Sequence, residues 1–166
     1  FILVRRDQHL RGRVIGAHAH RAFEIVVYLK GNGLSTMAGR TWPVRENDFI
    51  LYPPGVLHDQ VNASELTNLC VELEDCGLER FQGLWHDPSG LIRSTAERLL
   101  SEFNSRETGW EDLCEGLARE LVGLIKRQAA ARRELSGKGD PFARALKLAG
   151  EREGRVAPAQ LAKVCG

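Results

Sequence analysis

The sequence predicts a mainly β fold with helices at its C-terminal end, namely a closed barrel of short strands followed by two helices. Residues 1–76 contain short runs of β-branched and aromatic residues separated by turn residues, which is typical of a barrel or sandwich. After residue 77, apolar residues recur instead at helical spacing. We expect the sheet to close on itself, because an open sheet of this size would expose unpaired edge strands.

Three runs are the clearest strand candidates: residues 25–29 (IVVYL), 49–52 (FILY) and 69–75 (LCVELED). The first two are β-branched and aromatic over the length of a strand, and the third alternates between apolar and polar residues. Glycine, proline and asparagine mark the turns between strands. The expected turns lie at residues 31–33, 38–40, 46–48 and 53–55.

The first helix is expected to begin at Asp87, which would be its N-cap, with Pro88 at the first helical position. Apolar residues and one threonine then follow at helical spacing and would form its buried face. These residues are Leu91, Ile92, Thr95, Leu99, Leu100 and Phe103.

A second helix is expected to begin at Thr108, where Glu111 completes a capping box, and to continue to about Arg133. It carries a long stripe of apolar residues. The stripe consists of Leu113, Leu117, Leu121, Leu124 and Ile125. Such a stripe either packs on the chain's own barrel or forms the seam of a homodimer. Its four-residue steps do not keep a strict heptad, so both interpretations stay open.

Length and composition limit the function. The chain has 166 residues, enough for one domain with a core and an appendage, and its net charge of +1 gives no argument for nucleic-acid binding. No apolar run reaches membrane-spanning length, and arginines interrupt the N-terminal segment where a signal peptide would be apolar. The four cysteines lack C-x-x-C spacing, which favours free thiols in a cytoplasmic protein; a Cys70–Cys76 disulfide is the alternative.

Two separate stretches of the chain supply the residues of a metal site. His18 and His20 are two residues apart, so they share one face of a strand, and Glu24 has the same parity if the strand continues. His58 comes from a second stretch, residues 53–62. Three imidazoles and one carboxylate predict a divalent-metal site, with zinc as the first choice and nickel, iron(II) or manganese as alternatives. The competing interpretation is that these are hydrogen-bonded barrel residues without a metal.

The same two stretches resemble the two signature motifs of the cupin superfamily. The first motif matches at Gly12, His18, His20, Glu24 and Gly31, and the second at Pro53, Gly55, His58 and Asn62. The leading glycine of the second motif is replaced by Asn47, and asparagine tolerates the left-handed backbone that such a glycine supplies. The resemblance implies the cupin double-stranded β-helix barrel.

Strand parity also indicates candidates for the ligand pocket. Val26 and Tyr28 share the face of Glu24, and Gln60 shares that of His58. Gln60 could orient a ligand through hydrogen bonds. For Val26 and Tyr28, plain core packing is the alternative.

The C-terminal segment resembles the opening of the DNA-binding domain of AraC-type transcription regulators. The resemblance rests on Ala145, Leu146 and Ala149, and on Leu161, Ala162 and Gly166. It implies a cupin effector-binding barrel over residues 1–85, a helical dimerisation segment over 86–134, a linker over 135–140 and a truncated start of a helix-turn-helix domain over 141–166. The recognition helix, which would enter the major groove, lies beyond Gly166, so no residue here is expected to read DNA bases.

Three functions follow from these expectations. The resemblance implies the ligand-sensing and dimerising part of an AraC-type regulator, not an enzyme, with a small-molecule effector and with DNA as a partner of the full-length protein only. A metal-dependent cupin enzyme, such as a dioxygenase or isomerase, is the alternative, because three histidines and one glutamate leave open coordination positions. A metal-free module that binds a carbohydrate or small acid is the third.

Overall fold

The structure is a computed structural model that describes residues 3–137. The chain divides into two units, residues 1–126 and 127–166, and the barrel, the first helix and most of the second helix belong to the first unit. Among the described residues, neither helix has the length and apolar character needed to cross a membrane. The expected helix-turn-helix start, residues 141–166, lies outside the described part of the chain.

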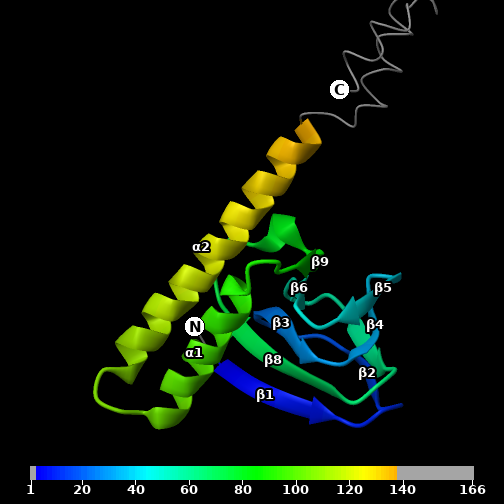
Figure 1. Cartoon of the computed structure of the whole chain (residues 1–166), viewed down its shortest axis with the longest axis horizontal. Coiled ribbons are helices and arrows are strands. Elements are labelled where there is room, and N and C mark those ends of the chain that lie inside the picture. The colour runs from blue at the N-terminus through cyan, green and yellow to red at the C-terminus, as the bar shows by residue number, and fades with distance from the viewer. Residues whose placement is uncertain (1–2, 138–166) are drawn as a thin grey trace, which may run out of the picture. The chain divides into compact units, whose positions relative to one another are not determined.

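Nine strands form two antiparallel sheets, shown in Figure 1. One sheet has the order β1-β8-β3-β6-β9 and the other β2-β7-β4-β5. The strands are β1 Leu3–His9, β2 Val14–His18, β3 Phe23–Lys30, β4 Asn32–Met37, β5 Arg40–Arg45, β6 Asp48–Tyr52, β7 His58–Asn62, β8 Leu66–Leu73 and β9 Gly83–His86. The chain crosses repeatedly from one sheet to the other, so the predicted cupin barrel followed by two helices is confirmed.

Burial explains the sequence pattern of the strands. Every residue of β3 except Lys30 is buried, because one face points into the barrel and α1 (Leu91–Ser105) lies against the sheet formed by β1, β3 and β8. By contrast, β4 alternates between exposed and buried residues, as a strand with one solvated face does. The runs predicted as strands at residues 25–29 and 49–52 lie within β3 and β6.

The turn residues of the two motifs adopt the backbone that the sequence predicts. Asn47 connects β5 to β6 with φ of +65°, which confirms that asparagine takes the left-handed position of the motif glycine. Gly31 connects β3 to β4 with φ of +87°. A Cβ atom added there would lie 2.1 Å from the carbonyl oxygen of Glu65, so this position has no room for a side chain.

Gly31→Ala should therefore lower the free energy of unfolding by at least about 2 kcal/mol, since it adds a backbone clash to a strained φ. Gly39→Ala is a matched control, because Gly39 has φ of +77° but nothing within 4 Å of an added Cβ. Urea unfolding of both variants separates the clash from the strain. Equal losses of stability would contradict the close approach at Gly31.

Both helices begin later than the sequence predicts. α1 begins at Leu91, after Gly90 with φ of +71°, instead of at Pro88. Asp87 still accepts a hydrogen bond from the backbone N–H of Arg93 (3.0 Å), so it satisfies a helix donor from outside the helix. α2 spans Trp110–Gly137, and Gly109, with φ of +86°, excludes a helical start at Thr108.

Two further differences concern chain segments with weak local signals. The sequence does not predict β9, because this strand has only four residues (GLWH) and is recognisable mainly by its pairing with β6. α2 continues to Gly137, into the segment expected to be a linker, because residues 133–135 (Arg, Glu, Leu) have high helix propensity. The rest of that expected linker lies outside the described residues.

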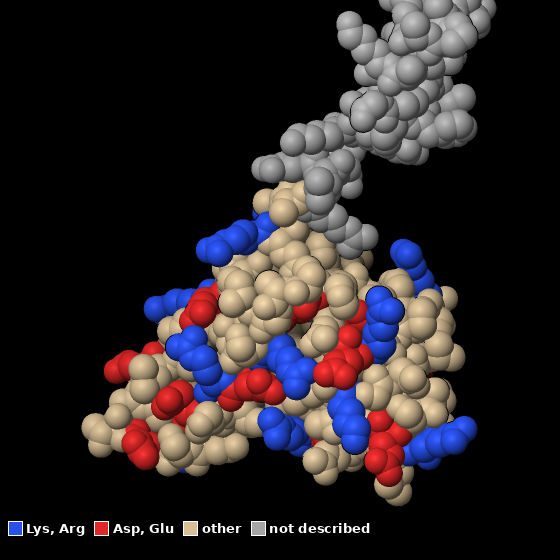
Figure 2. All heavy atoms as spheres, viewed as in Figure 1, with Lys and Arg blue, Asp and Glu red and all other residues tan. Residues whose placement is uncertain are grey.

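The apolar stripe of α2 is largely buried within one chain. Leu117, Leu121 and Ile125 are buried, whereas Leu113 is 52% exposed. Glu120, on the adjoining face, accepts hydrogen bonds from Thr95 and Arg98 of α1, at 3.4 Å each. The central leucines therefore belong to the core of this chain. In the face that Figure 2 shows, acidic and basic side chains are interspersed, in keeping with the small net charge.

Candidate metal centre and ligand cavity

The four predicted metal ligands come together inside the barrel. His18 ends β2, His20 follows it, Glu24 lies on β3 and His58 begins β7. One potential ligand atom from each lies within 4.8 Å of all the others. The register pairs His18 with His58 across β2 and β7, and their ring centroids are 4.4 Å apart. Strand pairing therefore brings His18 to His58. His20 lies in the loop after β2 and Glu24 lies on a strand of the other sheet, so the single continuous strand that would give His18, His20 and Glu24 one parity is not present.

Backbone carbonyl oxygens orient two of the imidazoles. Nδ1 of His18 lies 2.8 Å from the carbonyl oxygen of Gly16, and Nδ1 of His58 lies 3.0 Å from that of Val56. A carbonyl oxygen only accepts hydrogen bonds, so Nδ1 carries the proton in both rings. In the neutral imidazole, Nε2 is then unprotonated and carries a free lone pair. An imidazole nitrogen binds a metal in this form. The ring of His58 also stacks on Tyr52, with centroids 4.0 Å apart.

Glu24 is buried and is held as a carboxylate. Burial alone would raise its pKa, but the neighbouring side chains of His58, His20 and Arg5 together lower it. Its Oε1 accepts a hydrogen bond from Nη2 of Arg5 (3.2 Å), while Oε2 lies 3.3 Å from Nε2 of His20 and 3.2 Å from Nε2 of His58. Arg5 thus occupies one carboxylate oxygen and leaves the other facing the imidazoles.

This donor set fits a divalent metal ion. Within residues 3–137, Nε2 of His20 and Nε2 of His58 are buried and have no hydrogen-bond partner. A lone pair aimed at a carboxylate oxygen about 3 Å away is unfavourable unless a cation or proton lies between them. Three imidazole nitrogens and one carboxylate oxygen suit zinc, and also nickel, iron(II) and manganese. Such an ion would act there as a Lewis acid.

The cluster lies at one end of a cavity of about 260 Å³. His18, Glu24 and His58 line it, and so do two of the predicted pocket residues, Val26 and Gln60. Tyr28 lies behind this wall: it is fully buried, and its hydroxyl donates a hydrogen bond to Oε1 of Gln60 (2.9 Å). The structure thus brings Gln60 and Val26 to the cavity and places Tyr28 in the core that supports them.

Several residues that line the cavity were not predicted from the sequence. Arg5, Asp7 and His9 share one face of β1 and all line the cavity. Their spacing of two residues, which places them on one face of a strand, is the signal that could have indicated them. Cys70 also lines the cavity, where burial and then the charge of Glu24 raise the pKa of its thiol. Cys70 does not belong to the four-residue cluster. Cys70, Cys76 and Cys114 are all free thiols.

Comparison with solved structures finds proteins that are similar to part of this chain. They include a conserved protein of unknown function from Streptococcus pyogenes (24% identity, TM-score 0.42, 43% of this chain and 62% of that chain). A cupin superfamily protein from Desulfitobacterium hafniense has 14% identity, a TM-score of 0.42, and coverage of 43% and 66%. A predicted oxalate decarboxylase from Thermotoga maritima has 28% identity, a TM-score of 0.42, and coverage of 43% and 65%. The chain therefore spans slightly less than two thirds of each of these proteins.

No curated protein matches the sequence significantly. One family model does match: that of the AraC-like ligand binding domain, over residues 2–134. This match covers far more than half of the 166 residues. The chain belongs to the family of AraC-like ligand-binding domains.

Proposed function

We propose that the chain is the effector-sensing part of an AraC-type transcription regulator, in which the barrel binds a small molecule beside a divalent metal ion. The observation that carries this proposal is the cavity itself. Three of the four convergent metal ligands, His18, Glu24 and His58, line one of its ends, in a chain of a ligand-binding family. A concave site with a few fixed polar groups is the usual form of a small-molecule site.

The residues around the cluster have separate tasks in this proposal. His18, His20, Glu24 and His58 hold the ion, with zinc as the first choice. Arg5 and the two backbone carbonyls fix the ligand atoms in place, which is how outer-shell groups tune a metal site. When bound, the ion supplies a coordination point for an oxygen atom of the effector.

A screen of small metabolites tests effector binding. We expect some compounds to raise the melting temperature of the zinc-loaded protein, because a ligand at a hundred times its Kd stabilises the folded state by about 2.7 kcal/mol. The same compounds should have little effect on His58→Ala, which lacks a metal ligand. If no compound stabilises the loaded protein, or if the variant responds equally, sensing beside a metal is contradicted.

Signalling to DNA would require that effector binding favour one arrangement of two chains over another. The buried leucines of α2 are not free to form a dimer seam, but Leu113 is exposed and Leu124 is only partly buried. These two residues are eleven positions apart, about three helical turns, and so share a face. We propose that this face of α2 joins two chains in a homodimer that presents the DNA-binding domains of the full-length protein.

Sedimentation equilibrium tests the seam. Leu113→Glu should weaken the dimer at least tenfold, because it places a charge in an apolar contact. Leu91→Glu is the control, since Leu91 is similarly exposed but lies on α1. A dimer that survives Leu113→Glu as well as it survives Leu91→Glu would rule out this face.

A metal-dependent enzyme is the second candidate, favoured by one observation: the cluster faces an open cavity instead of being sealed in the core. Mass spectrometry of the stabilising compounds after incubation with the loaded protein separates the two. A sensor returns them unchanged. Consumption of a compound that is lost in His58→Ala would support the enzyme.

A further inference from the structure

We propose that the ligand of the cavity is a small hydroxylated carboxylate, whose carboxylate is held by Arg13 and His9 and whose hydroxyl groups are held by Asn68 and Asp7. This inference rests on the proposed function, because it assigns the chemical class of the effector. It concerns the end of the cavity opposite the metal cluster, where nothing in the family comparison assigns a role.

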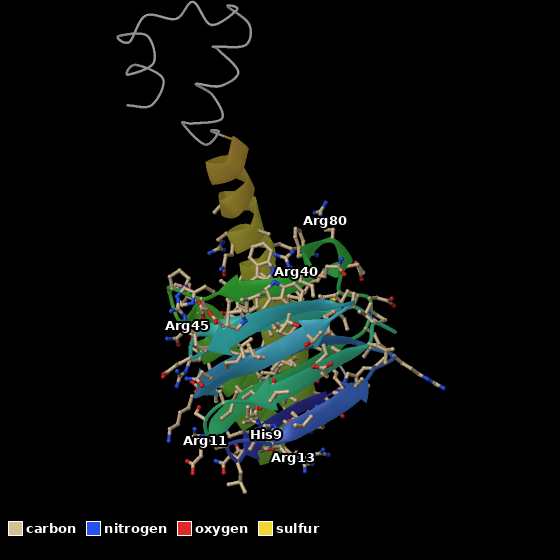
Figure 3. The ribbon with its side chains drawn as sticks, turned by 90° about the vertical axis from the view of Figure 1, so that its right-hand side faces the viewer. His9, Arg11, Arg13, Arg40, Arg45 and Arg80 are labelled. Carbon is tan, nitrogen blue, oxygen red and sulfur yellow. The ribbon has the colours of Figure 1, made fainter. Side chains whose placement is uncertain are left out.

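Strand register places these residues together and away from the metal. Asp7 of β1 is opposite Asn68 of β8, and Asn68 is opposite Tyr28 of β3. Glu24 is opposite Glu72, four residues further along β8, which corresponds to roughly 13 Å of backbone. Figure 3 shows His9, Arg11 and Arg13 together at the end of the barrel where β1 connects to β2.

Two buried polar atoms at this end lack partners. Asn68 is 3% exposed, and its Oδ1 has no hydrogen-bond partner among residues 3–137. Its Nδ2 has only a 3.5 Å contact with Sγ of Cys70, so either orientation of the amide leaves one polar atom unpaired. Nε2 of His9 is likewise buried and unpaired. A buried polar group without a partner is costly, and a polar ligand removes that cost.

The charges indicate which ligand satisfies these groups. Arg13 lines the cavity and has no ion-pair partner among the described residues, unlike Arg5, which pairs with Asp7, Glu24 and Glu72. Arginine binds carboxylates through paired hydrogen bonds. The amide oxygen of Asn68 is an acceptor without a donor, and a hydroxyl group would supply one. The Asp7 carboxylate already accepts from Arg5 and Cys70 through Oδ2, and its Oδ1 can accept from a second hydroxyl group.

Simpler ligands leave part of this site unpaired. An unsubstituted fatty acid satisfies Arg13 but offers no donor to Asn68, and a neutral polyol satisfies Asn68 but leaves Arg13 without an anion. The cavity volume of about 260 Å³ lies just below the usual range for small-molecule pockets, which suits a compact ligand. A carboxylate with several hydroxyl groups meets all three conditions, and a hydroxyl oxygen can also reach toward the metal end.

Calorimetric titration of the zinc-loaded protein with three matched compounds tests the class. Gluconate carries a carboxylate and hydroxyl groups, sorbitol has the same carbon number without charge, and hexanoate has the carboxylate without hydroxyls. We expect gluconate to bind at least tenfold more tightly than either of the others. Equal binding of sorbitol or hexanoate, or no binding of gluconate, would overturn the proposal.

Variants at this end of the cavity test the residues. Arg13→Ala and Asn68→Ala should each weaken gluconate binding at least tenfold, whereas Arg11→Ala should leave it within about twofold. Arg11 is a matched control because it is an exposed arginine of the same connection that does not line the cavity. Arg13 is also exposed, so its replacement leaves the core intact, and the melting temperature of each variant checks folding.

The outcomes separate this inference from the proposed function. Gluconate binding that persists in Arg13→Ala and Asn68→Ala but is lost in His58→Ala would place the ligand on the metal alone. That result overturns the hydroxyl and carboxylate assignment and leaves sensing beside a metal intact. If other metabolites stabilise the zinc-loaded protein but gluconate does not bind, the hydroxyl and carboxylate assignment is again overturned. Sensing beside a metal is then still supported.

Discussion

Replacing His58 with alanine should lower the affinity of the protein for zinc by at least about a hundredfold, since even outer-shell changes at metal sites cost 10- to 100-fold. His58 is 5% exposed, and its Nε2 faces Oε2 of Glu24 at 3.2 Å. No other described histidine or carboxylate joins the four-residue cluster, so nothing nearby replaces the lost ligand. Competition with a chromophoric chelator measures the affinity.

His9→Ala is the control for this result. It removes a histidine from the same cavity that does not belong to the cluster, so zinc affinity should stay within about twofold. Comparable losses of zinc affinity in both variants would mean that zinc binds elsewhere, or that any change in the cavity lowers the affinity indirectly. Retention of wild-type affinity in His58→Ala would remove His58 from the site.

Leu121→Ala should lower the free energy of unfolding by about 2–5 kcal/mol, the usual cost of emptying a fully buried leucine site. Leu121 is 0% exposed within a single chain. The loss should not depend on protein concentration, because the side chain is buried before any second chain is added. Urea unfolding at two protein concentrations measures both quantities.

Leu113→Ala is the matched control on the same helix. Leu113 is half exposed, so its truncation should change the stability of one chain by no more than about 0.5 kcal/mol. A small, concentration-dependent effect at Leu121 would instead place that leucine in a dimer seam and contradict its burial in the core.

The sequence predicts the members of the metal cluster but not the way in which they meet. A shared face was expected from a strand that continues from His18 to Glu24, but β2 ends at His18 and Glu24 lies on β3 of the other sheet. The meeting of His58 with His18 could not be derived from spacing, because it depends on the register between β2 and β7. Only the resemblance of residues 53–62 to a second motif brought that residue to the site.

The remaining features depend on long-range packing, which the local pattern does not encode. Tyr28 has the strand parity of a cavity residue but does not line the cavity. Its hydroxyl group instead donates a hydrogen bond to Gln60, which does line it. The role of Arg5 beside the cluster could not be predicted from its local spacing, because its partners Glu24 and Glu72 are 19 and 67 residues away. The start of α1 was misplaced because the left-handed turn at Gly90 delays it, although Asp87 still caps a helix donor.

Anomalous scattering from crystals of the protein grown with zinc is the most direct measurement of the central claim, that four side chains from β2, β3, β7 and the loop after β2 bind one ion. We expect a single strong peak in contact with Nε2 of His18, His20 and His58 and with Oε2 of Glu24. Absence of a peak at this position at saturating zinc, or a peak held by other residues, would contradict it.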